Sequence, residues 1–139
     1  MSDYDPNNIF GKILRGEIPS HKVFEDEVVL AMMDIFPQSK GHLLVIPKTP
    51  SRNLLDADPA TLAAAMPYVQ RLARAAKTAL GADGIRVAQF NEAPAGQSVF
   101  HLHFHIIPIY VNVELAPHIG GKADDDELAA QAKAIAAAL

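Results

Sequence analysis

The 139-residue chain contains no cysteine. This absence excludes a disulfide framework and any zinc site built on thiolates. The sequence also lacks an apolar run near the roughly 20 residues that a membrane-spanning helix needs. Its first residues are acidic and polar, unlike those of a signal peptide. We therefore expect a cytoplasmic protein that does not associate with membranes.

An excess of positive charge is also missing. Lysine and arginine number 12 against 16 aspartate and glutamate residues, which gives a formal net charge of −4. This balance argues against broad binding to nucleic acids. Half of the residues are hydrophobic, enough to bury a core. The length favours a single domain over residues 1–139.

Histidines are concentrated at one place in this chain. His101, His103 and His105 stand at alternate positions, and apolar residues separate them. Alternation of this kind predicts a β-strand with all three imidazoles on one face. Packing alone gives no reason to align three titratable rings, so the pattern indicates a functional site.

Two chemistries fit three aligned imidazoles, and the first is metal binding. Histidines two apart on a strand can share one zinc ion. At about 3.3 Å per residue, however, His101 and His105 lie roughly 13 Å apart, and Zn–N bonds measure about 2.0–2.1 Å. A metal would therefore need a further ligand, such as His42 or His118.

The second chemistry is nucleophilic attack by an imidazole on phosphorus. A neutral imidazole is a competent nucleophile near neutral pH, and neighbouring rings disfavour a positive charge on it. The preceding loop, residues 91–98, contains proline and glycine, which interrupt regular structure. Within it Gly96 allows close approach of the backbone to a ligand, and Ser98 is expected on the histidine side.

Periodicity predicts an α+β domain. Besides the histidine strand, strand patterns occupy residues 21–25, 28–33, 42–47 and 85–90. Helical patterns occupy residues 9–15, 59–80 and 124–139. We expect an antiparallel meander with the helices packed to one side and one end, a flexible tail over residues 1–7, and a C-terminal extension over residues 111–139. The apolar stripe of the long helix is expected to comprise Leu62, Met66, Val69, Ala73, Ala76 and Leu80.

These patterns together resemble the histidine-triad (HIT) nucleotide hydrolases, and most closely their Hint branch. Residues 101–107 match the signature of three alternating histidines and apolar residues. Further matching blocks follow the same order along residues 7–110, at 8–13, 15–19, 24–26, 33–38, 41–48 and 96–99. The resemblance implies a HIT-like fold and a homodimer in which the two sheets continue into one another.

The resemblance also implies roles for particular residues. Asp34 would hold both ribose hydroxyls, since a carboxylate accepts two hydrogen bonds, although a turn residue is the alternative. His42 would support the catalytic rings, although a surface position is the alternative. Asn91 would contact sugar or phosphate, and Gly96 and Gln97 would belong to the phosphate loop. The base pocket would be walled by Ile9, Phe10, Ile13 and Ile35, although core packing could equally explain the first three.

The implied reaction begins with attack by His103 on the α-phosphorus of a purine nucleotide such as an AMP phosphoramidate. A covalent nucleotidyl-histidine forms and water then hydrolyses it. His101, His105 and Ser98 would stabilise the phosphoryl oxygens, and Ser98 would protonate the leaving amine. The reaction needs no metal and no cofactor.

One departure and three alternatives accompany the resemblance. Many bacterial members carry a zinc-binding Cys-x-x-Cys pair where this chain has Asn8 and Gly11. A metal-dependent hydrolase remains one alternative. A dinucleoside polyphosphate hydrolase of the Fhit branch is another, although Ser98 favours the Hint branch because Fhit members tend to have threonine there. The third is a regulatory protein that binds nucleotides without cleaving them.

Overall fold

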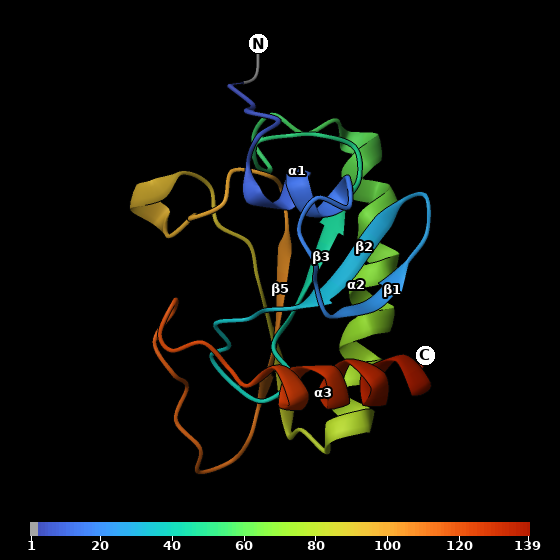
Figure 1. Ribbon diagram of the computed structural model, residues 1–139, viewed down its shortest axis with the longest axis vertical. Coiled ribbons are helices and arrows are strands. Elements are labelled where there is room, and N and C mark those ends of the chain that lie inside the picture. The colour runs from blue at the N-terminus through green and yellow to red at the C-terminus, as the bar shows by residue number, and fades with distance from the viewer. Residues whose placement is uncertain (1–2) are drawn as a thin grey trace.

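The computed structural model describes residues 3–139 and confirms the expected α+β fold (Figure 1). Its five strands form one antiparallel sheet in the order β1-β2-β3-β5-β4. The strands are β1 (Lys22–Glu25), β2 (Val29–Met33), β3 (Leu43–Pro47), β4 (Gly84–Ala88) and β5 (Phe104–Ile109). The helices are α1 (Ile9–Leu14), α2 (Pro59–Leu80) and α3 (Asp125–Ala137), and a 3-10 turn spans Ala93–Ala95. Within the described residues, no helix is long and apolar enough to cross a membrane.

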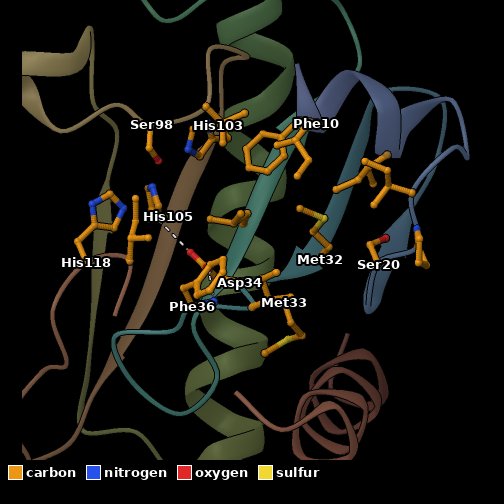
Figure 2. A pocket seen from close by; sticks show the side chains of 18 residues that line it. Phe10, Ser20, Met32, Met33, Asp34, Phe36, Ser98, His103, His105 and His118 are labelled. Carbon is orange, nitrogen blue, oxygen red and sulfur yellow. Dashed lines mark hydrogen bonds and ion pairs between the residues drawn. The ribbon is translucent and has the colours of Figure 1, made fainter. Parts of the chain in front are cut away.

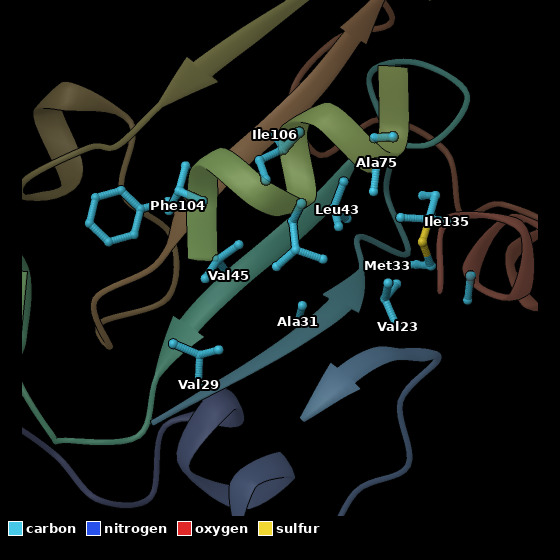
Figure 3. Close-up of a cluster of buried hydrophobic side chains, with 14 of the residues drawn as sticks. Val23, Val29, Ala31, Met33, Leu43, Val45, Ala75, Phe104, Ile106 and Ile135 are labelled. Carbon is cyan, nitrogen blue, oxygen red and sulfur yellow. The ribbon is translucent and has the colours of Figure 1, made fainter. Parts of the chain in front are cut away.

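The two faces of the sheet bury two different apolar clusters. Side chains alternate along a strand, so Val29 and Ala31 of β2 lie on the face covered by α2 and α3, whereas Leu30 and Met32 lie on the α1 face. Figure 3 shows the larger cluster, in which Val45 and Ile106 from the central strands lie with Ile135 of α3. The same alternation turns His105 of β5 toward the α1 face. The site is therefore built on the side that the long helices leave open.

The long helix α2 follows its sequence signals at both ends. Asp58 accepts a hydrogen bond from the Ala60 N–H at the first turn, and Gly81 ends the helix at a φ of +63°. The expected apolar stripe was wrong at Met66, which is 46% exposed. The buried residues instead include Ala65 and Ala75, because alanines let the helix backbone approach the sheet closely.

The histidine strand begins later than predicted. β5 starts at Phe104, so His101 and His103 precede it and only His105 lies within it. The β3–β5 ladder ends at the Val45–Phe104 pair. Two positions further along β3 the same register would place Pro47 opposite Leu102, and Pro47 has no N–H to donate to a ladder. The Pro47 carbonyl instead accepts a hydrogen bond from the His101 ring, with Nε2 and O 2.7 Å apart.

The segments outside the sheet make specific contacts. Residues 110–123, which connect β5 to α3, are irregular and contact the loop after β2. There the Ala116 N–H donates to the Gln38 carbonyl, and the Gln38 amide donates to the Ala116 carbonyl. Near the N-terminus, the Tyr4 hydroxyl lies 2.7 Å from Nδ1 of His101. The flexibility of residues 1–7 stays a prediction, and residues 1 and 2 lie outside the described part of the chain.

Candidate active site

A cavity of about 290 Å³ lies on the α1 face of the sheet. Its walls come from α1, β2, β3, the start of β5 and the loops that follow β2 and precede β5. Figure 2 shows His103, His105, Ser98 and His118 toward one end, Asp34 near the middle, and Met32 and Ser20 toward the other end. The cavity is thus polar at one end and apolar at the other. Its size is near the lower end of the range for small-molecule sites.

His103 is held with one ring nitrogen ready to act as a nucleophile. Its Nδ1 lies 2.7 Å from the carbonyl oxygen of His101. A carbonyl can only accept, so Nδ1 carries the proton and Nε2 keeps its lone pair. The ring is 8% exposed and packs edge-on against Phe10, with centroids 4.8 Å apart. Burial lowers the pKa of His103 to about 4, so the ring is neutral at pH 7.

His105 receives its proton position from a chain of hydrogen bonds. The Gln38 backbone N–H donates to Nδ1 of His42 at 3.0 Å, so neutral His42 carries its proton on Nε2. His42 Nε2 then donates to Nδ1 of His105 at 2.9 Å. His105 is left with a proton on Nε2, which is buried and has no partner within residues 3–139. Burial lowers the pKa of His42 to about 4 and that of His105 to about 2.

These hydrogen bonds leave two complementary groups in one cavity, one on His103 and one on His105. His103 offers a lone pair and His105 offers an N–H donor, with ring centroids 5.0 Å apart. An orphaned buried donor is costly unless a ligand satisfies it. A phosphoryl group meets both demands, because its phosphorus accepts the lone pair and its oxygens accept hydrogen bonds.

Asp34 lines the middle of the cavity. Its Oδ1 accepts a hydrogen bond from the Phe36 N–H at 2.8 Å, and its Oδ2 lies 3.4 Å from His42 Nε2 and 4.0 Å from His105 Nδ1. Burial raises the pKa of this carboxyl. The position, between the imidazoles and the apolar walls, fits the expected ribose contact, which stays a prediction.

Asp34, His42 and His105 also form a cluster whose ligand atoms lie within 4.8 Å of one another, as a metal site would require. Their hydrogen bonding opposes that use. A ligating imidazole usually donates its second N–H to an acceptor, but His42 Nδ1 accepts from the Gln38 backbone. Its Nε2 therefore keeps a proton and has no lone pair for a metal. The metal alternative is disfavoured at these three residues by this geometry.

The apolar end contains all four residues expected to wall a base. Ile9, Phe10 and Ile13 of α1 line it, together with Ile35 from the loop after β2. The Asn8 side chain begins α1 by accepting a hydrogen bond from the Gly11 N–H. The helix thus presents Phe10 and Ile13 both to the smaller core cluster and to the cavity. The two interpretations of these residues, core and pocket wall, therefore apply together.

Besides His42, which acts through its hydrogen bond to His105, four predicted residues do not line the cavity. His101 is fully buried, and its two ring nitrogens are bonded to the Tyr4 hydroxyl and the Pro47 carbonyl. Its ring holds the backbone in place, while its carbonyl orients His103. The other three are Asn91, Gly96 and Gln97, which belong to the loop before β5. Substrate contact by these four residues stays a prediction.

The Gln97 side chain shapes that loop from within. Its amide nitrogen donates to the carbonyls of Arg52 and Val99, and its amide oxygen accepts from the Glu92 N–H. Arg52 forms a two-point ion pair with Glu92 at 2.9 Å. Glu92 has a positive φ of 76°, which is uncommon for a residue with a side chain. These contacts hold the loop that delivers Ser98 to the cavity.

Ten of the 18 residues that line the cavity were not predicted as substrate-site residues, and His118 and Ile119 are among them. His118 and Ile119 reach the cavity from the irregular segment between β5 and α3. The His118 ring packs edge-on to His105, with centroids 5.6 Å apart. The sequence pointed to His118 only as a metal ligand, because an irregular segment has no periodicity that places a side chain on a face.

Comparisons with known proteins show the family to which the chain belongs. The HIT domain family matches residues 15–112. "Protein hit" of Bacillus subtilis is 46% identical over 104 residues, which are 75% of this chain and 72% of that protein. "Adenosine 5'-monophosphoramidase HNT1" of Saccharomyces cerevisiae is 44% identical over 100 residues, 72% of this chain and 61% of that protein. "Adenylylsulfatase HINT3" of Arabidopsis thaliana is 41% identical over 100 residues, 72% of this chain and 51% of that protein.

A solved structure extends the likeness to almost the whole chain. A "Hit-like protein involved in cell-cycle regulation" from Bartonella henselae superposes with a TM-score of 0.93 at 56% identity, covering 98% of each chain. The fold and the paired imidazoles define a histidine-triad protein. This chain belongs to the HIT family, as its sequence patterns indicated. The family and the hydrolase names of its Hint-type relatives support a nucleotide hydrolase.

Proposed function

We propose that this protein cleaves the α-phosphate bond of AMP phosphoramidates or related AMP derivatives through a covalent nucleotidyl-His103. The observation that carries the proposal is the fixed pair of imidazole tautomers. His103 Nε2 has a lone pair, and His105 Nε2 has a buried, unpartnered proton. The names of the yeast and Arabidopsis relatives, a phosphoramidase and an adenylylsulfatase, favour substrates in which AMP is joined to a small leaving group.

In the first step, His103 Nε2 forms a bond to the α-phosphorus while the bond to the leaving group breaks. Ser98, which lines the cavity beside the imidazoles, donates the proton that an amine leaving group needs. The His105 N–H stabilises charge on a phosphoryl oxygen. The phosphorylated ring of His103 is cationic, and the His101 carbonyl, 2.7 Å from Nδ1, stabilises that charge through a shorter, charge-assisted hydrogen bond.

In the second step, water attacks phosphorus and gives one proton to Ser98, which restores the hydroxyl, while the bond to Nε2 breaks. AMP leaves, and His103 recovers its lone pair with the proton still on Nδ1. Dividing one displacement into two easier ones is the advantage of covalent catalysis. The apolar walls would hold a purine, Asp34 would bind the ribose, and neither step requires a metal or a cofactor.

Intact-mass analysis tests this reaction. The purified protein is mixed with adenosine 5'-phosphoramidate, with and without a strong chelator, and quenched at short times. We expect a transient increase of one AMP, unaffected by chelator and absent from His103→Ala. Turnover should fall by at least about 10³-fold in that variant, as for loss of other nucleophiles. His21→Ala is the matched control, because His21 pairs with Asp125 away from the cavity.

The other functions predict different outcomes. Turnover that ends when chelator is added would refute the metal-free reaction. Tight AMP binding without adduct or turnover would favour a non-catalytic nucleotide-binding protein. A strong preference for dinucleoside polyphosphates over phosphoramidates would place the protein with the Fhit-type hydrolases.

We also propose that the protein is a homodimer whose two sheets join. The order of strands leaves β4 at one edge of the sheet, and an edge strand offers unpaired backbone groups to another chain. Val87 of β4 is 49% exposed. Sedimentation equilibrium should show a dimer that Val87→Asp weakens, whereas Arg86→Asp is a control for added negative charge on the same strand. A monomer at all concentrations would refute the proposal.

A further inference from the structure

The segment between β5 and α3 supplies a histidine from outside the matched HIT domain. That match ends at residue 112, whereas His118 and Ile119 line the cavity. Figure 2 shows His118 next to His105 and on the same side of the cavity as Ser98. The reaction described above does not use this side chain.

The segment is fixed to the wall of the cavity at several points. Gln38 and Ala116 exchange two hydrogen bonds, at 2.8 Å and 3.1 Å. The Ala123 N–H donates to the Ile35 carbonyl at 2.9 Å, and the Tyr110 hydroxyl donates to the Lys40 carbonyl at 2.8 Å. The loop after β2 that carries these acceptors also carries Asp34. His118 is therefore held in register with the rest of the site.

The geometry places His118 where a leaving group must go. A nucleotide with its base against the apolar walls and its phosphorus at His103 spans the length of the cavity. The group beyond phosphorus then extends to the end occupied by Ser98 and His118 (Figure 2). The His118 ring packs edge-on against His105 and at a tilt against Phe90, with centroids 5.6 Å and 5.8 Å away.

The chemistry of that end leaves one role for His118. No lysine or arginine lines the cavity within residues 3–139. His103 must remain neutral to attack, and His105 Nδ1 is occupied by the donor from His42. The ring nitrogens of His118 make no hydrogen bond within the same residues, so the ring can offer an N–H donor without breaking an internal contact. A hydrogen bond from this donor to an ionised oxygen is charge-assisted through its acceptor.

We propose that His118 contacts the leaving group and selects leaving groups that carry an anionic oxygen, such as a sulfate or a phosphate, over uncharged amines. This inference rests on the function proposed above and assigns specificity at the same site. His118 acts in substrate discrimination, and the bond-making groups remain His103, His105 and Ser98.

The test compares two substrates that differ only in the leaving group: adenosine 5'-phosphosulfate and an AMP phosphoramidate of an uncharged amine. We measure kcat/KM for the wild type, His118→Ala, His118→Gln and the control His21→Ala. His118→Ala should lose about tenfold to hundredfold on the phosphosulfate, the range for a charge-assisted hydrogen bond. It should lose less than about threefold on the phosphoramidate. Gln, whose amide can still donate a hydrogen bond, should restore part of the loss.

Two results would overturn the assignment: equal losses on both substrates, or no loss on either. Binding is measured in parallel in the His103→Ala background, where His118→Ala should weaken the phosphosulfate alone. If the wild type cleaves neither substrate, the proposed function fails, and this binding comparison still decides the role of His118. Unchanged affinity for the phosphosulfate would then refute it.

Discussion

His42 has no direct access to the reacting atoms, yet its removal should impair catalysis through His105. In the wild type, the Gln38 N–H fixes the His42 proton on Nε2, and His42 fixes the His105 proton on Nε2. Without His42, the His105 proton can move to Nδ1, where Asp34 Oδ2 lies 4.0 Å away. His105 would then present a lone pair, instead of a donor, to the phosphoryl oxygen.

The size of the effect follows from two limits. Losing one buried neutral hydrogen bond changes the balance of tautomers by about 1 kcal/mol, which is roughly fivefold in rate. Losing an oxyanion donor outright costs about 10²–10³-fold. We therefore expect His42→Ala to lower kcat by about tenfold to hundredfold, with a smaller effect on KM. His42→Gln should retain most activity, since its amide can accept from Gln38 and donate to His105.

The assay combines steady-state kinetics with nitrogen-15 NMR of the histidine rings. The wild-type spectrum should show the His105 proton on Nε2, and His42→Ala should show a shift toward Nδ1. Urea unfolding of both variants separates this effect from the loss of stability that a cavity at a fully buried position causes. Wild-type kcat in folded His42→Ala, or a wild-type His105 proton on Nδ1, would refute the reasoning.

Three further predictions concern stability and the loop before β5. Burial lowers the pKa values of His42 and His103 to about 4 and that of His105 to about 2, so these rings bind protons on unfolding. The free energy of unfolding should therefore be full above about pH 6.5 and fall by up to about 1.4 kcal/mol per pH unit for each ring as pH falls toward 4. Asp34, whose pKa is raised, acts in the opposite sense, and urea midpoints unchanged from pH 7.5 to 5 would contradict the histidine prediction. Gln97→Ala should lower the free energy of unfolding by about 1–3 kcal/mol and reduce kcat/KM. Urea unfolding and steady-state kinetics measure both effects, and the control Gln70→Ala, at an exposed position, should change neither quantity. Tyr4→Phe removes the hydrogen bond to His101 and should lower the free energy of unfolding by about 0.5–1.5 kcal/mol, which thermal unfolding would detect as a reduced Tm.

The sequence predicts the order of the elements because each has a local signal. Asn8 begins α1, Asp58 begins α2 and Gly81 ends it. Apolar runs predict β2 and β3, which are buried at every position. His42 and His105 lie close together because of the strand order. His42 directly precedes β3, and β3 pairs with β5, which contains His105. Only a resemblance to known proteins could suggest that pairing beforehand.

The start of β5 could not be predicted from alternation, because alternation records which side a residue faces and not whether its backbone has a partner. Pro47 of β3 has no N–H to donate to the chain preceding β5. Its carbonyl instead accepts a hydrogen bond from the His101 side chain. The imidazole pattern thus serves two purposes. Its first ring fixes the backbone, and the next two face the cavity.

The loop after β2 links the chemistry to the C-terminal segment. One residue, Gln38, uses its backbone N–H to set the tautomer of His42, while its carbonyl and its side chain bind Ala116. The donor that His105 presents and the position of His118 therefore share one anchor. A segment that lies mostly outside the matched HIT domain is in this way tied to the residue that sets the tautomer of His42. A change that displaces Gln38 should therefore alter both the proposed leaving-group end and the donor of His105.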